Sequence, residues 1–109
     1  MEWQVETTAT AVIGRPIGKI DETTWEAFQV HLLAAVSQSA DASLPLVIDL
    51  AQLDYMSSRG LRVLKIAKDA AGTGAPITLA APNDRMRQII ESSRYDMLFK
   101  VVADVASAV

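Results

Sequence analysis

The sequence predicts an α/β fold, in which helices pack on a single-layer, mostly parallel β-sheet with an antiparallel edge strand. Two observations support this fold class. Apolar runs of strand type alternate with amphipathic segments of helical period, in the order β-β-α-β-α-β-α with a short C-terminal element. The chain has 109 residues, of which 50% are hydrophobic, and this suffices for one core of ordinary domain size. We therefore expect a single domain over residues 1–109.

The antiparallel edge is expected from the start of the chain. Residues 2–6 alternate between polar and apolar side chains, and residues 8–13 form a second β-rich run. Gly14, Pro16 and Gly18 then predict a turn, because glycine and proline interrupt regular structure. No Gly-Lys-Ser/Thr sequence follows, so these glycines are not expected to form a phosphate-binding loop.

A first helix is expected to begin near Thr23 and to end at about Ser37. Thr23 and Glu26 have the spacing of a capping box. A short polar linker over residues 39–43 is expected to follow this helix. The apolar side chains that recur at helical spacing, and that we expect to face the core, are Trp25, Phe28, Leu32, Ala35 and Val36.

The middle of the chain predicts a buried strand and a second helix. Residues 45–50 form a continuous apolar run, which is typical of a central parallel strand covered on both faces. Ser57 or Ser58 begins the helix, which extends to about Ala71 and is ended by residues 72–74. The side chains expected to point inward from this helix are Leu61, Leu64, Ala67 and Ala71.

The last third of the chain predicts one more strand and one more helix. Residues 76–80 are apolar like the first buried strand, and Asn83 can cap a third helix. Residues 95–102 are expected to return the chain as a short strand, and residues 104–109 to form a final helical turn. The apolar stripe of the third helix comprises Met86, Ile89 and Ile90.

The composition excludes several kinds of partner and site. The chain has no cysteine, which excludes disulfides and thiolate metal sites. Thirteen acidic and ten basic residues give a net charge of −3, and the basic residues are scattered singly, so nucleic acid is not an expected partner. There is no signal-peptide pattern and no apolar run of about 20 residues. We expect a soluble, cytoplasmic protein without direct membrane insertion.

The residue types that could support catalysis lack suitable neighbours in the sequence. His31 is the only histidine and lies toward the edge of the first helix's apolar face, where a structural role is expected. Asp21, Asp49 and Asp54 could bind Mg²⁺ or accept a phosphoryl group, but the acidic pair and late lysine of a receiver domain are absent. Asp49 is instead expected to form local hydrogen bonds. We therefore expect no catalytic residue, no metal and no cofactor, and the protein is not expected to be an enzyme.

The segment from Val47 to Leu61 carries the most specific pattern in the chain. It reads as a buried strand, a short acidic turn and two serines that begin a helix, so it places polar residues at the carboxyl end of a parallel strand, where binding sites tend to lie. It resembles the STAS domain shared by anti-sigma factor antagonists and sulfate transporter tails. The matching positions are Asp49-Leu50, Tyr55-Met56, Ser57-Ser58 and Gly60-Leu61, and residues 18–21 and 94–99 extend the resemblance over the whole chain.

This resemblance implies the function of an anti-sigma factor antagonist, which binds an anti-sigma factor serine kinase and so regulates sigma-dependent transcription. It also implies that phosphorylation at Ser58 switches the binding off, with Ser57 as second choice for the acceptor, and that a PP2C-type phosphatase reverses it. Ser57 stands where many members carry Asp, and Arg59 stands where the sporulation antagonist has serine. The alternative function is that of a cytoplasmic STAS subunit of a phospholipid-transporting ABC complex. The oligomeric state is not predicted.

A hydroxyl at a helix start just past a strand end is expected to be exposed and near free backbone N–H groups. Either serine of the pair could cap the helix, leaving the other as acceptor. Met56 either packs under the loop or forms part of the contact surface. The residues expected to contact the partner are Asp21, Asp54, Met56, Ser57, Ser58, Arg59, Leu61 and Arg62.

Overall fold

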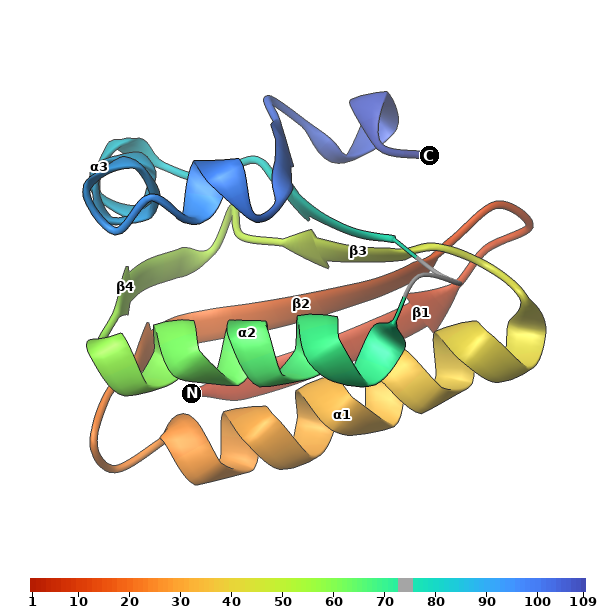
Figure 1. Ribbon diagram of the computed structural model, residues 1–109, viewed down its shortest axis with the longest axis horizontal. Helices are drawn as coiled ribbons and strands as arrows, with labels where there is room; N and C mark the ends of the chain where they lie inside the picture. The colour runs from red at the N-terminus through yellow and green to blue at the C-terminus, as the bar shows by residue number, and fades with distance from the viewer. Residues whose placement is uncertain (73–75) are drawn as a thin grey trace.

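The computed structural model describes residues 1–72 and 76–109 (Figure 1). Two short 3₁₀ helices lie at Tyr95–Met97 and Val105–Ser107. The strands and α-helices are β1 (Glu2–Thr7), β2 (Val12–Ile20), α1 (Trp25–Ala42), β3 (Leu46–Asp49), β4 (Leu53–Met56), α2 (Ser58–Ala71), β5 (Ile77–Ala80), α3 (Asp84–Ser92) and β6 (Lys100–Val102).

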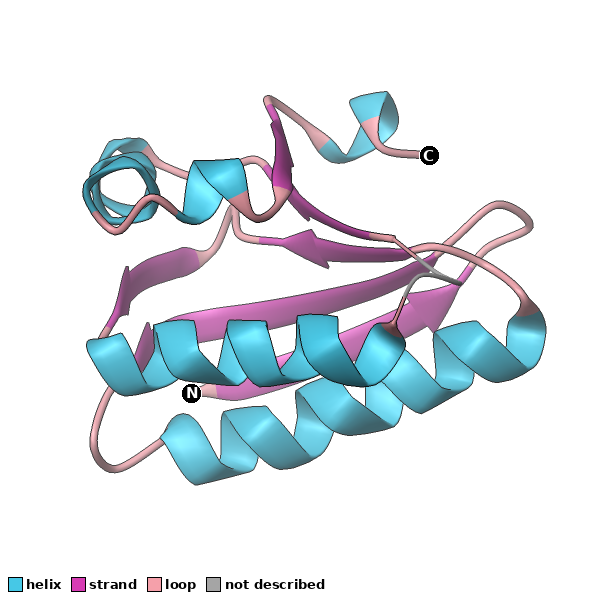
Figure 2. Ribbon diagram, in the orientation of Figure 1, coloured by secondary structure: helices cyan, strands magenta, loops and turns pink. Residues whose placement is uncertain are grey.

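The strands of the described residues form a mostly parallel sheet with an antiparallel pair at one edge, which confirms the predicted fold class (Figure 2). The strand order is β1-β2-β3-β5-β6, and β4 pairs with β2 off this path. The β1–β2 pair is antiparallel, and the other described pairs are parallel. Along one side of β2, residues 12–14 pair with β3 and residues 18–20 pair with β4.

The turn predicted at Gly14, Pro16 and Gly18 is wrong, because all three residues lie inside β2. A Cβ atom on Gly14 would lie 2.6 Å from the Trp3 ring of β1, so glycine is needed there for close packing. Pro16 falls between the stretch of β2 that pairs with β3 and the stretch that pairs with β4. On that side no partner strand requires its missing N–H.

The acidic turn predicted before the two serines is also wrong, because most of it is strand β4. Gly18 pairs with Leu53 and Lys19 pairs with Tyr55, so Asp54 is an extra residue in the ladder. This β-bulge leaves both Asp54 and Tyr55 exposed, and strict polar–apolar alternation is lost. A four-residue strand with a bulge has no period-2 pattern to detect.

Helix α1 begins and ends later than the sequence predicted. The capping box at Thr23 and Glu26 is wrong, since Thr24 precedes the helix and no side chain caps it. The expected polar linker is helical up to Ala42, and Ser39 is buried with its hydroxyl donating to the Val36 carbonyl at 2.9 Å. That local bond satisfies the serine without ending the helix.

Helices α1 and α2 lie side by side on one face of the sheet and enclose the main core with it (Figure 1). Phe28 and Leu32 of α1 and Leu64 of α2 are fully buried there, as predicted. Trp25 and Leu61 are only half-buried at the margin, whereas Val63, which the prediction omitted, is 1% exposed. The other face has a smaller buried cluster of Ala11, Ile13, Val47 and Ala80, packed against Val102, Val105 and Ala108.

Two further strand predictions are only partly right. Residues 8–11, predicted as part of the second strand, connect β1 to β2, and the Thr8 N–H donates to the Ala11 carbonyl at 2.8 Å across this turn. Of residues 95–102, predicted as a short strand, only Lys100–Val102 are strand, because the segment begins with the 3₁₀ helix Tyr95–Met97.

The predicted cap of the third helix and the predicted end of the second helix agree with the structure. Asn83 caps α3 by accepting a hydrogen bond from the Met86 N–H at 2.8 Å, and its side-chain amide donates to the Leu53 carbonyl at the free side of β4. Gly72 ends α2, while Gly74, part of the predicted helix end, lies outside the described residues. None of the helices in the described ranges has both the length and the hydropathy needed to cross a membrane.

Candidate functional site

The candidate site lies at the end of the molecule where β2 and β4 finish and where α1 and α2 begin (Figure 1). The two strand ends are held together because the Ser57 N–H donates to the Ile20 carbonyl at 2.8 Å. The turn over residues 21–24 and the first turn of α2 therefore come side by side, although more than thirty residues separate them in sequence. This junction sets the geometry of the predicted partner-binding residues.

The two serines of the motif have different structural roles. Ser57 is the N-cap of α2, and its hydroxyl accepts a hydrogen bond from the Gly60 N–H at 3.4 Å. Ser58 is the first residue of α2 and is exposed, and its hydroxyl has no hydrogen-bond partner among the described residues. Of the two arrangements that the sequence left open, the structure selects Ser57 as the cap. Ser58 is left with a free hydroxyl at the positive end of the helix dipole.

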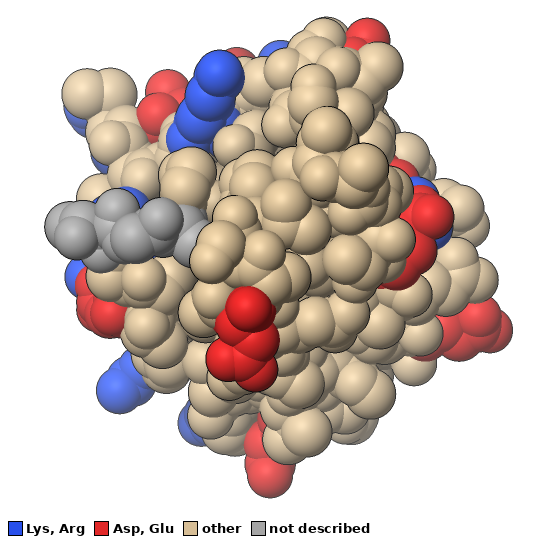
Figure 3. All heavy atoms as spheres, turned by 90° about the vertical axis from the view of Figure 1, so that its right-hand side faces the viewer, with Lys and Arg blue, Asp and Glu red and all other residues tan. Residues whose placement is uncertain are grey.

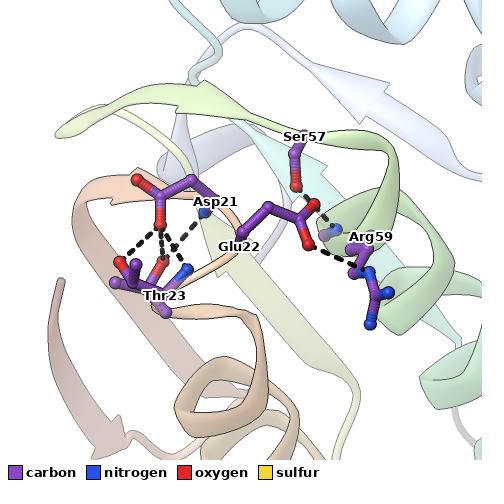
Figure 4. Close-up of polar contacts among 7 residues, drawn as sticks. Asp21, Glu22, Thr23, Ser57 and Arg59 are labelled. Carbon is purple, nitrogen blue, oxygen red and sulfur yellow. Dashed lines mark hydrogen bonds and ion pairs between the residues drawn. The ribbon is translucent and has the colours of Figure 1, made fainter.

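Asp21 organises the turn before α1 (Figure 4). Its Oδ1 atom accepts hydrogen bonds from the Thr23 N–H at 2.9 Å and from the Thr23 hydroxyl at 2.8 Å. Together with a third bond from the Thr24 hydroxyl, at 3.3 Å, these contacts lower the pKa of the Asp21 carboxyl, the Thr23 side chain having the largest effect. The predicted contact residue is therefore a negative charge that the turn holds in one orientation.

Arg59 links the two neighbouring elements of the site. Its Nε atom lies 3.1 Å from Oε2 of Glu22 (Figure 4). Its guanidinium group also lies over the Trp25 ring, at 5.1 Å from the ring centroid. The ion pair is well exposed and contributes little to stability, but both contacts orient the arginine. Glu22 was missed at the level of sequence, since nothing local relates it to a residue on another helix.

The structure brings most of the predicted contact residues to one surface. Asp54, Ser58, Arg59 and Arg62 are exposed, and Asp21 and Leu61 are half-buried beside them. Met56 is only 2% exposed and packs under the loop, so its assignment to the contact surface is wrong. Tyr55, which was not assigned to this surface, is 37% exposed next to Asp54 because of the β-bulge.

Two of the residues considered as catalytic candidates, Asp49 and His31, lie outside the candidate site and have other contacts. Asp49 is buried, and its Oδ2 atom accepts a bond from Arg15 Nε at 2.8 Å while Oδ1 accepts the Ala51 N–H at 3.0 Å, which confirms local hydrogen bonding. The hydrogen bond to Asp49 is the largest of the effects that raise the pKa of the Arg15 guanidinium. His31 is exposed and stacks on Trp3 at 5.7 Å. Within residues 1–72 and 76–109, no group of three His, Asp or Glu side chains could hold a metal ion.

The two ends of the molecule differ in charge. Figure 3 shows the end that carries the C-terminus and the β1–β2 turn, and most of its surface is neither acidic nor basic. At the opposite end, the candidate site combines Asp21 and Glu22 of the turn before α1 with Asp54 of β4 and with Arg59 and Arg62 of α2. Charge patterns of this kind fix the orientation of a bound protein more than they increase its affinity.

The comparisons with known proteins cover almost the whole chain. The model of the STAS domain matches residues 2–108. No curated protein matches the chain in sequence.

Three solved structures illustrate the similarity. An anti-sigma factor antagonist from Mycobacterium paratuberculosis is 25% identical, with a TM-score of 0.87 over 98% of this chain and 89% of its own. The anti-sigma factor antagonist SpoIIAA in its unphosphorylated form is 21% identical, with a TM-score of 0.72 over 98% of this chain and 92% of its own. SpoIIAA of Bacillus in its phosphorylated form is 20% identical, with a TM-score of 0.69 over 98% of this chain and 96% of its own.

Proposed function

The chain belongs to the STAS domain family, and on this premise we propose that it is an anti-sigma factor antagonist that phosphorylation at Ser58 switches off. In its unphosphorylated form it docks on an anti-sigma factor serine kinase in the cytoplasm and releases a sigma factor for transcription. A PP2C-type phosphatase restores the docking form. We also propose that the protein has no catalytic activity of its own.

The observation that carries the proposal is that the two adjacent serines have different structural roles. Ser57 is occupied as the cap of α2, whereas the neighbouring Ser58 hydroxyl is exposed and unbonded among the described residues. A kinase can therefore modify Ser58 without disrupting the helix start. The likeness to the mycobacterial antagonist, at 25% identity over 98% of the chain, supports the same function.

The sign of the switch follows from the charge of the phosphate. A phosphoserine carries about −1.5 to −2 charge at pH 7, and at position 58 it would add this charge to the proposed docking face, to which the exposed Asp54 also belongs. A docked partner would have to desolvate that charge, which weakens binding. At a cost of about 3 kcal/mol, affinity falls more than a hundredfold. The unphosphorylated and phosphorylated forms of SpoIIAA both share the fold of this chain, with TM-scores of 0.72 and 0.69, which supports an effect on the interface and not on folding.

The proposal is tested by identifying the partner and then the phosphorylated residue. Tagged protein is used to capture partners from its host lysate, and a kinase-like ATPase is the partner that we expect to recover. Recovery of an ABC-transporter ATPase instead would favour a transport subunit. The purified kinase should add one phosphate, which fragment mass spectra place on Ser58. Ser58→Ala should abolish the labelling, and Ser57→Ala is the matched control that should retain it.

A second measurement tests the switch itself. Ser58→Asp should bind the captured kinase much more weakly than the wild-type chain, whereas Ser58→Ala should bind normally and resist switching. Isothermal titration calorimetry gives both affinities. If Ser58→Asp stays folded and binds with wild-type affinity, the Ser58 surface is not the docking face.

A further inference from the structure

A groove of about 410 Å³ lies between α1 and α2, beside the proposed modification site. The residues that α2 contributes recur at helical spacing, so they form one continuous wall, and Trp25 and Gln29 of α1 form the other. The six lining residues are Trp25, Gln29, Arg59, Arg62, Val63 and Ile66.

The lining combines an apolar floor with two cations. Val63 is 1% exposed, and Trp25 and Ile66 are half-buried, so the floor offers hydrophobic surface. Arg59 is already paired with Glu22, but Arg62 is exposed and forms no ion pair among the described residues. The lining contains no carboxylate. The groove therefore complements a group that is both apolar and negatively charged.

We propose that this groove receives an acidic segment of the partner, with an apolar side chain on the floor and a carboxylate paired with Arg62. The inference rests on the proposed function, because it requires a docked anti-sigma factor. The groove adjoins the Ser58 surface, so a partner docked on that surface can extend directly into it. Small-molecule sites instead enclose their ligand and fix it with a few buried polar groups, whereas both arginines of this groove are exposed at its rim.

The position of Arg62 relative to Ser58 adds a second consequence. The two residues are four apart on α2, so their side chains are neighbours on the helix surface. A phosphate on Ser58 can form charge-assisted hydrogen bonds with Arg62. The partner's carboxylate and the phosphate would then compete for one guanidinium group. Phosphorylation would thus remove the cation that the partner requires, in addition to placing charge on the docking face.

The first test measures the affinity of the captured anti-sigma factor kinase for Arg62→Gln. The expected result is at least a tenfold loss of affinity and a weaker dependence of affinity on salt concentration. Arg87→Gln is the matched control, because Arg87 is an exposed arginine on α3 that lines neither the groove nor the hollow at Tyr55. It should bind within twofold of the wild-type chain. Thermal unfolding of both variants verifies that they are folded.

The second test locates the partner segment directly. A photo-crosslinking amino acid at Gln29, inside the groove, should attach to a partner peptide rich in Asp or Glu. The same group at Val30, which is 68% exposed on the outer side of α1, should not attach to that peptide. A crosslink from Gln29 to a basic or uncharged segment would overturn the proposal.

The outcomes separate this inference from the function on which it rests. If Arg62→Gln binds the kinase with wild-type affinity while Ser58→Asp binds weakly, the groove proposal is overturned and the antagonist function stands. If ATP changes the Trp fluorescence of the free wild-type chain but not of Arg62→Gln, and kinase affinity is the same for both, the groove binds a small anion and the proposal is again overturned. Failure to capture any anti-sigma factor contradicts the proposed function itself.

Discussion

Gly60 of α2 lies directly against Met56 of β4, so that no side chain fits between the helix and the strand. A Cβ atom at Gly60 would collide with the Met56 side chain and would lie 2.8 Å from Cγ2 of Ile20. Met56 and Ile20 are 2% and 0% exposed, so neither can move into solvent. This contact explains the Ser-Ser-x-Gly pattern physically, because the glycine brings the two serines of the helix start down onto the strand ends.

The first prediction concerns the replacement of this glycine. Gly→Ala within a helix normally stabilises by about 1 kcal/mol. Gly60→Ala should instead lower the free energy of unfolding by about 1–3 kcal/mol, because the added methyl group overpacks the junction. Urea denaturation measures the change. Ala70→Gly at an exposed position of the same helix is the control, and it should cost about 1 kcal/mol in the ordinary direction. A stabilised Gly60→Ala would contradict the contact.

The second prediction separates the two serines by stability. Ser57→Ala removes the cap of α2 and should cost about 1 kcal/mol. Ser58→Ala should change stability by less than about 0.5 kcal/mol, since its hydroxyl makes no bond among the described residues. Ser58→Asp should be neutral or slightly stabilising, because the first turn of α2 has no acidic residue and favours a negative charge. Thermal unfolding of the three variants checks this order, and a larger loss for Ser58→Ala than for Ser57→Ala would reverse the assignment of the cap.

The third prediction concerns the ion pair between Arg15 and Asp49 on the sheet. The side chain of Asp49 is only 9% exposed, whereas that of Arg15 is 22% exposed and has a second contact with Glu6 at 3.5 Å. Arg15→Met leaves a buried carboxylate without its cation and should cost about 3 kcal/mol. Asp49→Asn should cost less, about 1–2 kcal/mol, because it keeps an acceptor for the Ala51 N–H and leaves Arg15 its contact with Glu6. Chemical denaturation should show a larger loss of unfolding free energy for Arg15→Met than for Asp49→Asn. Equal losses would show that the unpaired, buried Asp49 carboxylate does not determine the cost.

The fourth prediction is a pH dependence that originates at Asp21. Its pKa is lowered in the folded chain, so the stability it contributes is complete above the unfolded value of about 3.9 and is lost as the pH falls through the folded value. The difference in unfolding free energy between the wild-type chain and Asp21→Asn should therefore be constant from pH 7 to about pH 5 and shrink in more acidic solution. Asp104, whose pKa is also lowered, is present in both proteins and cancels. A difference that stays constant down to pH 2 would show that the hydrogen bonds from Thr23 do not favour the carboxylate.

The sequence predicted the fold class because its signals are local and strong. The runs at β3 and β5 are continuous and apolar, and the buried faces of α2 and α3 recur at helical period. The cap at Asn83 is likewise a local signal, because its side chain bonds a backbone N–H three residues later.

Most of the errors arise where a distant part of the chain decides the structure. Gly14 and Pro16 suggest a turn in the sequence, but both lie inside β2. Gly14 is explained by the Trp3 ring packed against it, and Pro16 by its position between the stretches that pair with β3 and β4. Ser39 looks like a linker residue until its hydroxyl is seen to bond within the helix. Strand β4 is recognised only through its pairing with the end of β2. The Trp3 ring lies far in sequence from Gly14, and the end of β2 lies far in sequence from β4. Ser39 is the exception, because its partner Val36 lies in the same helix.

In the candidate site, too, the features that depend on local sequence were predicted and those that depend on the assembled fold were not. The motif placed Asp54, Ser58 and Arg62 on one surface, and they are exposed there. It could not assign the cap to Ser57, because two adjacent serines offer the same side-chain chemistry. The pairing of Glu22 with Arg59 depends on the meeting of two helix starts, which is a property of the assembled fold.

The β-bulge at Asp54 also determines how this protein can be recognised. A regular edge strand offers a row of backbone groups to any other chain and is a site of strand addition and aggregation. In β4 the ladder is broken at Asp54, and the Asn83 side chain occupies the Leu53 carbonyl on the free side. Both features make β4 a poor template for an added strand, and the side chains of Asp54 and Tyr55 are exposed there. Under the proposed function, recognition at β4 then depends on the identity of exposed side chains, which is how a chain can discriminate between similar partners.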